Sequence, residues 1–349
     1  FEPWTLLKDD GQPYKVFTPF WKACLRRGLD TSLRQAPTSM PEVPRRIATG
    51  SLDALELLPR IGWDSGLREG WRVGEQAASD RLESFLDDAA ASYPDDRNRP
   101  DLVGTSRLSP HLHFGEISPR QIAAAVDRFV GGHQRKGIVK GTESFVREVG
   151  WREFAYHLLY HFPNTTETPL DQRFAKFPWA KNYSKALEAW QHGQTGIPIV
   201  DAGMRELWHT GWMHNRVRMI VASLLTKNLL IPWQEGTRWF WDTLVDADLA
   251  NNTLGWQWTA GCGADAAPYF RIFNPVLQGE KFDPTGEYVR QWVPEIARLP
   301  DKYLNKPWEA AESVLSEAQV KLGKDYPEPI VDLKGSRERA LERFDRIKK

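Results

Sequence analysis

From about residue 75 onward, apolar residues recur at the 3.6-residue spacing of amphipathic helices. The stretches 75–86, 117–130 and 145–161 each carry such a stripe, whereas the alternation typical of strands is scarce. The clearest stripe has apolar residues at i, i+3, i+4, i+7 and i+8, namely Val217, Ile220, Val221, Leu224 and Leu225. Asn215 and Met219 lie four apart on another face of the same helix, which must meet something other than the main core. The pattern therefore predicts a mainly α fold.

The two ends of the chain differ from this helical middle. Residues 1–74 are rich in proline, glycine and turn signals, and we interpret them as a connector that wraps over the core. Residues 75–349 then form one helical domain, which ends in a charged helix over 336–349. The chain opens on Phe1 rather than Met, which suggests that it is part of a longer polypeptide.

Composition narrows the class of protein. Sixteen tryptophans in 349 residues exceed what a core requires, and several lie in polar surroundings, which indicates stacking surfaces or an electron relay. Lysine plus arginine equals aspartate plus glutamate at 46 each, so nucleic acid would bind only where basic residues gather on one face. There is no apolar run of about 18 residues to cross a membrane. Two cysteines, Cys24 and Cys262, make no disulfide framework, and the cytoplasm is the simplest location.

Three segments carry candidate chemistry. Residues 105–110, Thr-Ser-Arg-Leu-Ser-Pro, place hydroxyls and a guanidinium before a possible helix, which suits a pyrophosphate or is simply a helix cap. Residues Glu148, Trp151 and Arg152 share one helix face, either as a platform for a flat ligand or as an ordinary ion pair beside a tryptophan. Residues 246–252 gather short polar side chains in an expected loop, where capping is the simpler account. We find no metal-ligand spacing, no Rossmann fingerprint and no nucleophile elbow.

Taken in order, these strings resemble the photolyase/cryptochrome flavoproteins, and most closely a bacterial photolyase acting on cyclobutane pyrimidine dimers. The resemblance covers nearly the whole chain. It is carried by Tyr93, Thr-Ser-Arg-Leu-Ser-Pro (105–110), Glu-x-x-Trp-Arg-Glu-Phe (148–154), Gly-Trp-Met-His-Asn-Arg (211–216), Asp-Ala-Asp-Leu-Ala-Asn-Asn (246–252), Gly-Trp-Gln-Trp (255–258) and Tyr-Phe-Arg-Ile-Phe-Asn-Pro (269–275).

The resemblance implies a helical domain that holds a folded FAD. The family's N-terminal α/β antenna domain is missing from this chain, so a folate- or deazaflavin-type antenna chromophore is expected only if that domain is present. Asn252 would face the flavin N5, where plant-type cryptochromes usually carry Asp, and Asn favours a repair enzyme. The cofactor-binding residues implied by position are Tyr93, Thr105, Ser106, Arg107, Leu108, Ser109, Phe145, Arg218, Asp246, Asp248 and Asn252.

The implied activity is light-driven repair of cyclobutane pyrimidine dimers in UV-damaged DNA by a monomer associated with the nucleoid. Photolyases are among the enzymes known to flip bases, and a dimer is already poorly stacked. Glu148 would hydrogen-bond a thymine carbonyl edge and act in catalysis, while Trp151 would stack on the dimer. The other residues implied to contact the lesion or the DNA are Arg97, Arg152, Asn215, Arg216, Met219 and Trp258.

The resemblance also implies a chain of tryptophans that reduces the flavin in light. Trp256, Trp233 and Trp179 match the inner, middle and outer positions. The spacing from Trp179 to Trp190 is one residue longer than the family pattern, so another residue could replace Trp179 as the outer donor.

Three alternatives stay open. A cryptochrome photoreceptor would use the same FAD pocket, although Asn252 and the lesion face at 148–152 argue against it. A (6-4) photolyase would need a histidine pair, and His214 has no such partner. A module that binds single strands on aromatic platforms would leave the 246–252 segment unexplained.

Overall fold

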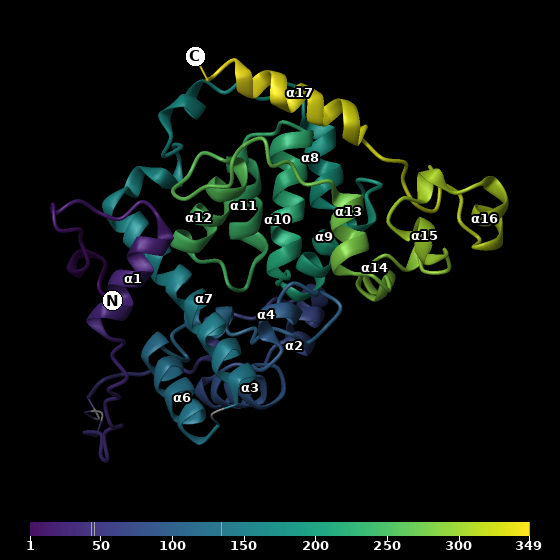
Figure 1. Ribbon diagram of the computed structural model, residues 1–349. Coiled ribbons are helices and arrows are strands. Elements are labelled where there is room, and N and C mark those ends of the chain that lie inside the picture. Colours follow the sequence, from purple (N-terminus) through teal and green to yellow (C-terminus); the bar gives the residue numbers. More distant parts are fainter. Residues whose placement is uncertain (43, 45, 134, 349) are drawn as a thin grey trace.

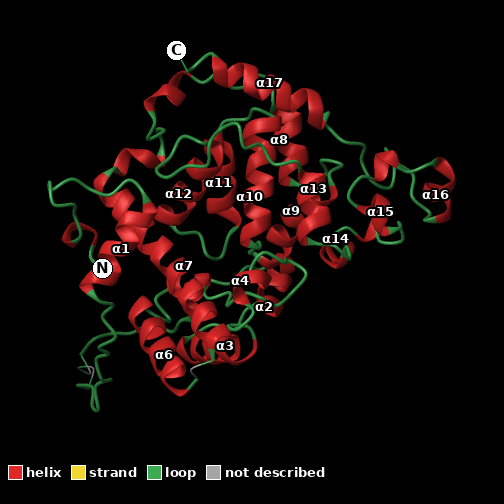
Figure 2. Ribbon diagram, in the orientation of Figure 1, coloured by secondary structure: helices red, strands yellow, loops and turns green. Residues whose placement is uncertain are grey.

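The computed structural model describes residues 1–42, 44, 46–133 and 135–348, and they form a helical body (Figures 1 and 2). Within these residues the only β pairing is one isolated bridge between Leu322 and Tyr326. None of their helices combines the length and the hydropathy needed to cross a membrane. The mainly α prediction is confirmed.

The helices of the first half are α1 (Phe17–Arg27), α2 (Ser65–Gly70), α3 (Glu75–Asp88), α4 (Tyr93–Asp96), α5 (Ser109–His113), α6 (Pro119–Gly132) and α7 (Lys136–His161). Those of the second half are α8 (Ser184–Gln191), α9 (Pro198–Thr210), α10 (Asn215–Ser223), α11 (Trp233–Thr243), α12 (Leu249–Ala260), α13 (Pro275–Phe282), α14 (Glu287–Trp292), α15 (Asp301–Leu304), α16 (Glu312–Glu317) and α17 (Leu333–Asp345).

The sequence periodicity locates most of these helices within a few residues. The stretches 75–86 and 117–130 correspond to α3 and α6, and the charged tail corresponds to α17. The stretch 145–161 is the second part of α7, which begins nine residues earlier at Lys136. That earlier start is missed because 136–144 carries two glycines and few apolar residues, so its helical state depends on packing rather than on local pattern.

The loop expected at 246–252 is correct only before α12, which begins at Leu249. Asp248 is the N-cap of α12, and its side chain accepts a hydrogen bond from the backbone N–H of Asn251. Asn251 and Asn252 therefore lie in the first turn of a helix. A capping aspartate satisfies one of the free N–H groups at a helix start, which explains the run of short polar residues.

Three apolar clusters hold the body together. The largest joins α8 to α12 and reaches α14 and α17. A second joins α3, α4 and α6 to the first half of α7, and a third joins α1 to the second half of α7. Helix α7 therefore runs through the molecule as the element shared by two clusters, with α12 packed against it (Figure 1).

Residues 1–74 divide into segments that behave differently. Helix α1 packs on α7, and α2 packs on α9, where the indole N–H of Trp71 donates to the carbonyl of Thr210 at 2.7 Å. Between them the chain runs away from the helical body (Figure 1, lower left), and Leu52, Leu57 and Ile61 are exposed. A domain boundary at residue 74 stays a prediction.

The stripe predicted on α10 is buried as expected and continues into a π-helical turn, Leu224–Asn228. This turn buries a charged side chain: Lys227 is 1% exposed. Its ammonium donates to the carbonyl of Arg271 at 3.1 Å and lies 5.1 Å from the centre of the Tyr269 ring. Burial lowers the pKa of Lys227 to about 7.

Candidate functional site

Helix α7 presents the predicted platform on one face. Glu148, Trp151 and Arg152 occupy positions i, i+3 and i+4 and are all half-buried, so each keeps an edge toward solvent. Because α7 contacts both α4 and α12, this face lies between the elements that carry the other candidate residues. The three residues are brought together as predicted.

Glu148 is paired with Arg97, which follows α4. The Nη1 group of Arg97 donates to Oε1 of Glu148 at 2.5 Å, and the Arg97 guanidinium also lies 5.4 Å from the Tyr93 ring centre. Burial lowers the pKa of Arg97, but the hydrogen bond and the charge of Glu148 outweigh it, so the pKa is raised. The pair presents a donor and an acceptor side by side.

Trp151 already has one aromatic neighbour. Its ring stacks on Phe17 of α1 with centroids 3.8 Å apart and planes inclined by 10°. Phe154 meets it edge-on at 5.8 Å. Phe17 of α1 therefore covers one face of the indole and fixes the orientation of the ring.

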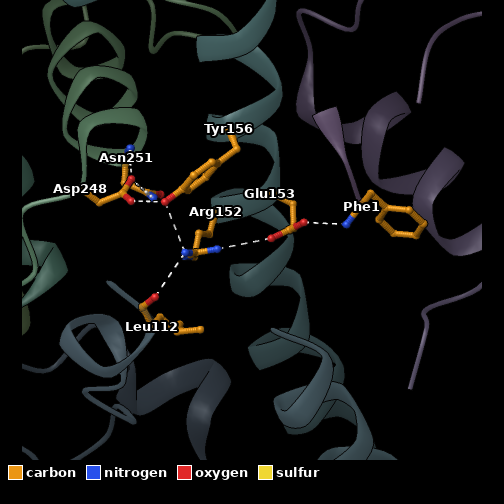
Figure 3. A network of polar contacts seen from close by, with 7 residues as sticks. All are labelled: Phe1, Leu112, Arg152, Glu153, Tyr156, Asp248 and Asn251. Atoms are coloured by element: carbon orange, nitrogen blue, oxygen red, sulfur yellow. Dashed lines mark hydrogen bonds and ion pairs between the residues drawn. The ribbon is translucent and has the colours of Figure 1, made fainter. Parts of the chain in front are cut away.

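Arg152 belongs to a polar network that reaches α12 (Figure 3). Its Nη2 group donates to the Tyr156 hydroxyl at 3.4 Å and to the Leu112 carbonyl at 3.5 Å, and its guanidinium lies 4.7 Å from the Tyr156 ring centre. The Tyr156 hydroxyl in turn donates to Oδ2 of Asp248. A candidate DNA-binding residue and a candidate cofactor residue are thus joined through one tyrosine.

Helix α10 supplies the next candidates. Asn215 is exposed and Met219 is half-buried, away from the buried stripe of the same helix. The Arg216 guanidinium donates to Oδ1 of Asn98 and lies 4.3 Å from the Phe282 ring centre. Burial, and then the charges of Arg97 and of Arg271 in the loop before α13, lower the pKa of Arg216.

A second cluster gathers around Trp212, between α9 and α10. Arg218 donates to both carboxylate oxygens of Asp246, at 2.8 and 3.1 Å, and its Nε donates to the Met213 carbonyl at 2.7 Å. The Arg107 and Arg218 guanidinium carbons lie 4.5 and 5.9 Å from the Trp212 ring centre. The Trp212 indole N–H donates to Oγ of Ser109 at 3.3 Å. Two cations and a hydroxyl therefore converge on one indole, and one of the cations holds a carboxylate.

The remaining candidates of 93–145 divide between this cluster and the core. Thr105 and Ser106 are half-buried in the turn before α5, and Arg107 adopts a left-handed backbone with φ of 50°. Leu108 is buried. Tyr93 and Phe145 are also buried, with ring centres 5.8 Å apart and edge to face, and belong to the α3–α6 cluster.

Four guanidiniums surround the buried His214. Burial, and then the charges of Arg107, Arg216, Arg218 and Arg97, lower the pKa of His214 to about 3, so the imidazole is neutral. Its Nδ1 accepts the backbone N–H of Arg216 at 3.1 Å, which places the proton of the neutral ring on Nε2. That Nε2 is buried without a protein partner within the described residues.

The tryptophans predicted to relay electrons lie around the start of α11. Trp256 is buried, and its ring packs so closely on Gly236 that a Cβ there would come within 1.9 Å of it. Trp233 is buried at the first residue of α11. Trp179 is half-buried, and the following residue donates its N–H to the carbonyl of Leu230 at 2.8 Å. All three therefore pack near one helix end.

Two candidates on α12 remain. The amide of Asn252 donates to the carbonyl of Thr237 at 3.0 Å, which holds the side chain toward α11. Trp258 is half-buried, two residues after Trp256, and so points from a different side of the helix.

Sequence reasoning missed Tyr156, Trp212 and Asn98 as site residues. Tyr156 had a usable signal, because it lies four residues after Arg152 on the same helix face. Trp212 lay within a quoted string but was assigned no role. Asn98 had no signal, since its contact with Arg216 joins positions 118 apart in the chain.

Comparison with known proteins places this site in a family. Residues 145–346 match the pattern described as the FAD-binding domain of DNA photolyase. The chain is 48% identical to a deoxyribodipyrimidine photo-lyase of Agrobacterium fabrum, over all of this chain and 72% of that protein. It is 39% identical to cryptochrome-1 of Arabidopsis thaliana, over 99% of this chain and 51% of that protein. The crystal structure of a bacterial class III photolyase from Agrobacterium tumefaciens superposes with a TM-score of 0.89 at 47% identity, covering the whole chain and 71% of that structure. The chain belongs to the family of photolyase FAD-binding domains.

The residues of the candidate site fit flavin adenine dinucleotide (FAD). Around Trp212, Arg107 and Arg218 offer positive charge to a diphosphate, and the Arg218–Asp246 pair offers both a donor and acceptors to a polar ring edge. His214 Nε2 and Trp256 Nε1 are buried donors without protein partners in the described part of the chain. Such orphaned donors are costly unless a ligand or water satisfies them. Among the described residues, no three histidine, cysteine, aspartate or glutamate side chains gather as a metal site.

Proposed function

We propose that this protein repairs cyclobutane pyrimidine dimers in UV-damaged DNA, using light and bound FAD. The observation that carries the proposal is the arrangement of α7, whose one face presents Glu148, Trp151 and Arg152 and is linked through Tyr156 to Asp248 of the cofactor side. Lesion and cofactor would then lie next to each other along one face of a rigid helix.

The pair formed by Arg97 and Glu148 suits the edge of a thymine. That edge carries a carbonyl, an N–H and a second carbonyl in a row. A guanidinium donates to a carbonyl, and a carboxylate accepts from the N–H, so the pair can satisfy two adjacent groups at once. The face of Trp151 opposite Phe17 would stack on the flipped dimer, and Asn215 and Met219 of α10 would line the opposite wall.

The candidate cofactor residues would bind the FAD and orient it. Thr105 to Ser109 would contact the diphosphate, with Arg107 as its counter-charge, and Tyr93 and Phe145 would support that segment from the core. Asp246, held by Arg218, and Asp248 would bond the isoalloxazine and ribose region, and Asn252 would face the ring. When bound and reduced, FAD supplies the excited-state electron that opens the two bonds between the pyrimidines.

Trp256, Trp233 and Trp179 would return the cofactor to its reduced form in light. Trp256 and Trp233 are buried and Trp179 is half-buried, which supports Trp179 as the outer member of the chain. Arg152, Arg216 and Trp258 would complete the DNA-facing rim. We also propose that the protein acts as a monomer, and that a further domain, where present, holds an antenna chromophore.

A repair assay tests the proposal. The purified protein, loaded with reduced FAD, is mixed with UV-irradiated oligo(dT) and exposed to blue light while the thymine absorbance is followed. Recovery of absorbance in light, with none in darkness, is expected. Glu148→Gln keeps the shape and an acceptor but loses the charge, so it should bind the lesion and repair it with a lower yield per absorbed photon. Flavin binding without light-dependent recovery would instead favour a photoreceptor.

A further inference from the structure

Tyr156 occupies a position that no sequence motif marks, yet it touches both sides of the proposed site. Its hydroxyl donates to Oδ2 of Asp248, and its oxygen accepts from Arg152 at 3.4 Å (Figure 3). Burial, and then the bond to Asp248, raise the pKa of Tyr156 to about 12, so the phenol remains a donor at neutral pH. One hydroxyl is therefore shared between Arg152, proposed above to face DNA, and Asp248, proposed above to face the cofactor.

Asp248 is the point through which this contact can act. Its Oδ1 accepts from the backbone N–H of Asn251 at 2.8 Å and from the Asn251 amide at 2.6 Å, so one carboxylate oxygen caps α12 and the other is held by Tyr156. Asn252 and Trp256 lie on the helix that begins at this cap. A carboxylate held at both oxygens is fixed in direction, and the start of α12 is fixed with it.

We propose that Tyr156 is a positioning residue that couples the DNA-facing Arg152 to the cofactor-facing Asp248, so that flavin and damaged DNA bind cooperatively. The proposal rests on the function proposed above. When a DNA phosphate binds and fixes the Arg152 guanidinium, Arg152 fixes the Tyr156 hydroxyl. The hydroxyl in turn holds Asp248 in the orientation that binds the flavin. Conversely, a flavin held by Asp248 fixes Tyr156 and hence Arg152. Thermodynamic linkage makes these two effects equal in size.

Tyr156→Phe removes the hydroxyl and keeps the ring under the Arg152 guanidinium. Loss of a hydrogen bond to a carboxylate corresponds to about a tenfold change in an equilibrium constant. The Kd for FAD, measured by fluorescence titration of the apoprotein, should therefore rise about tenfold. Tyr160→Phe is the matched control, because Tyr160 lies one turn later on α7 and is 54% exposed. It should leave the Kd for FAD within about twofold of the wild-type value.

A double-mutant cycle separates positioning from general destabilisation. Asp248→Asn still caps the helix through its one oxygen but turns an amide NH₂, a donor, toward Tyr156, so the Tyr156 hydroxyl loses its acceptor. If Tyr156 acts through Asp248, the loss in FAD affinity caused by Tyr156→Phe should shrink to about twofold or less in the Asp248→Asn background. Equal losses in both backgrounds would overturn the proposal. The melting temperature of each apoprotein reports the merely structural effect.

The coupling itself is measured in darkness. The Kd for a fluorescent, UV-irradiated oligo(dT) is determined with and without FAD, and the ratio of the two values is the coupling. We expect this ratio to fall at least about threefold in Tyr156→Phe and to be unchanged in Tyr160→Phe. An unchanged ratio in Tyr156→Phe would overturn the proposal. Because no repair is needed, a protein that binds flavin and DNA but repairs nothing would refute the proposed function and leave the coupling measurable.

Discussion

The buried ammonium of Lys227 makes a strong prediction about stability. The side chain sits in the π-helical turn after α10 with a carbonyl at 3.1 Å and the Tyr269 ring as its contacts, and no carboxylate pairs with it among the described residues. We consider Lys227→Met, which keeps a long flexible side chain and removes the charge.

The size of the expected change in the free energy of unfolding follows from the pKa of Lys227. An unfolded lysine titrates near 10.5, whereas the native group titrates at about 7 because burial disfavours its charged form. Between these two pH values the unfolded chain holds a proton that the native chain lacks, so raising the pH stabilises the native state. At about 1.4 kcal/mol per pH unit, the interval amounts to roughly 5 kcal/mol. Loss of the contacts to the Arg271 carbonyl and the Tyr269 ring offsets part of this.

The assay is urea unfolding of wild type and Lys227→Met at several pH values from 6 to 10.5, with the same FAD concentration throughout. The variant should be more stable by roughly 2–4 kcal/mol near pH 6, and its advantage should disappear toward pH 10.5. Lys22→Met, at an exposed position on α1, is the control and should show no such trend. A difference between Lys227→Met and wild type that stays constant with pH would refute the reasoning.

Three further predictions concern the site. Trp151→Ala should weaken binding of UV-irradiated oligo(dT) by about 10- to 100-fold, the worth of one stacked base, in a fluorescence titration; an unchanged Kd would exclude stacking on this ring. Gly236→Ala should place a methyl group against Trp256 and destabilise the protein by about 1–3 kcal/mol in urea unfolding, while also slowing photoreduction of the flavin; wild-type stability would show that the ring has room to move. Arg216→Gln should reduce the slope of log Kd against log salt by about one, and an unaltered slope would mean that this guanidinium meets no phosphate.

The sequence reveals those parts of the fold that depend on local pattern. The five-residue stripe over 217–225 predicted the buried face of α10 and of the turn after it correctly, because the spacing of apolar residues in an amphipathic helix shows which side faces the core. The start of α7 escaped prediction, since glycines at 137 and 141 leave no stripe and the helix there depends on tertiary packing.

The site follows the same division. Glu148, Trp151 and Arg152 lie on one face because they belong to one helix, so their spacing in the sequence was sufficient to predict this grouping. The pairing of Arg97 with Glu148, and that of Tyr156 with Asp248, joins residues 51 and 92 positions apart. Contacts of this kind are created by the packing of α4 and α12 on α7, and no periodicity within one sequence encodes them.

The four guanidiniums around His214 belong to a chain whose formal charges cancel, with 46 basic and 46 acidic residues. The electric field of such a molecule is that of a multipole, and at physiological ionic strength it fades within about 8 Å. An approaching polyanion would meet a neutral body until that range and would then be attracted where guanidiniums such as these gather. Encounters in other orientations would be brief, so a search along a long polyanion would proceed by many short visits rather than by prolonged sliding.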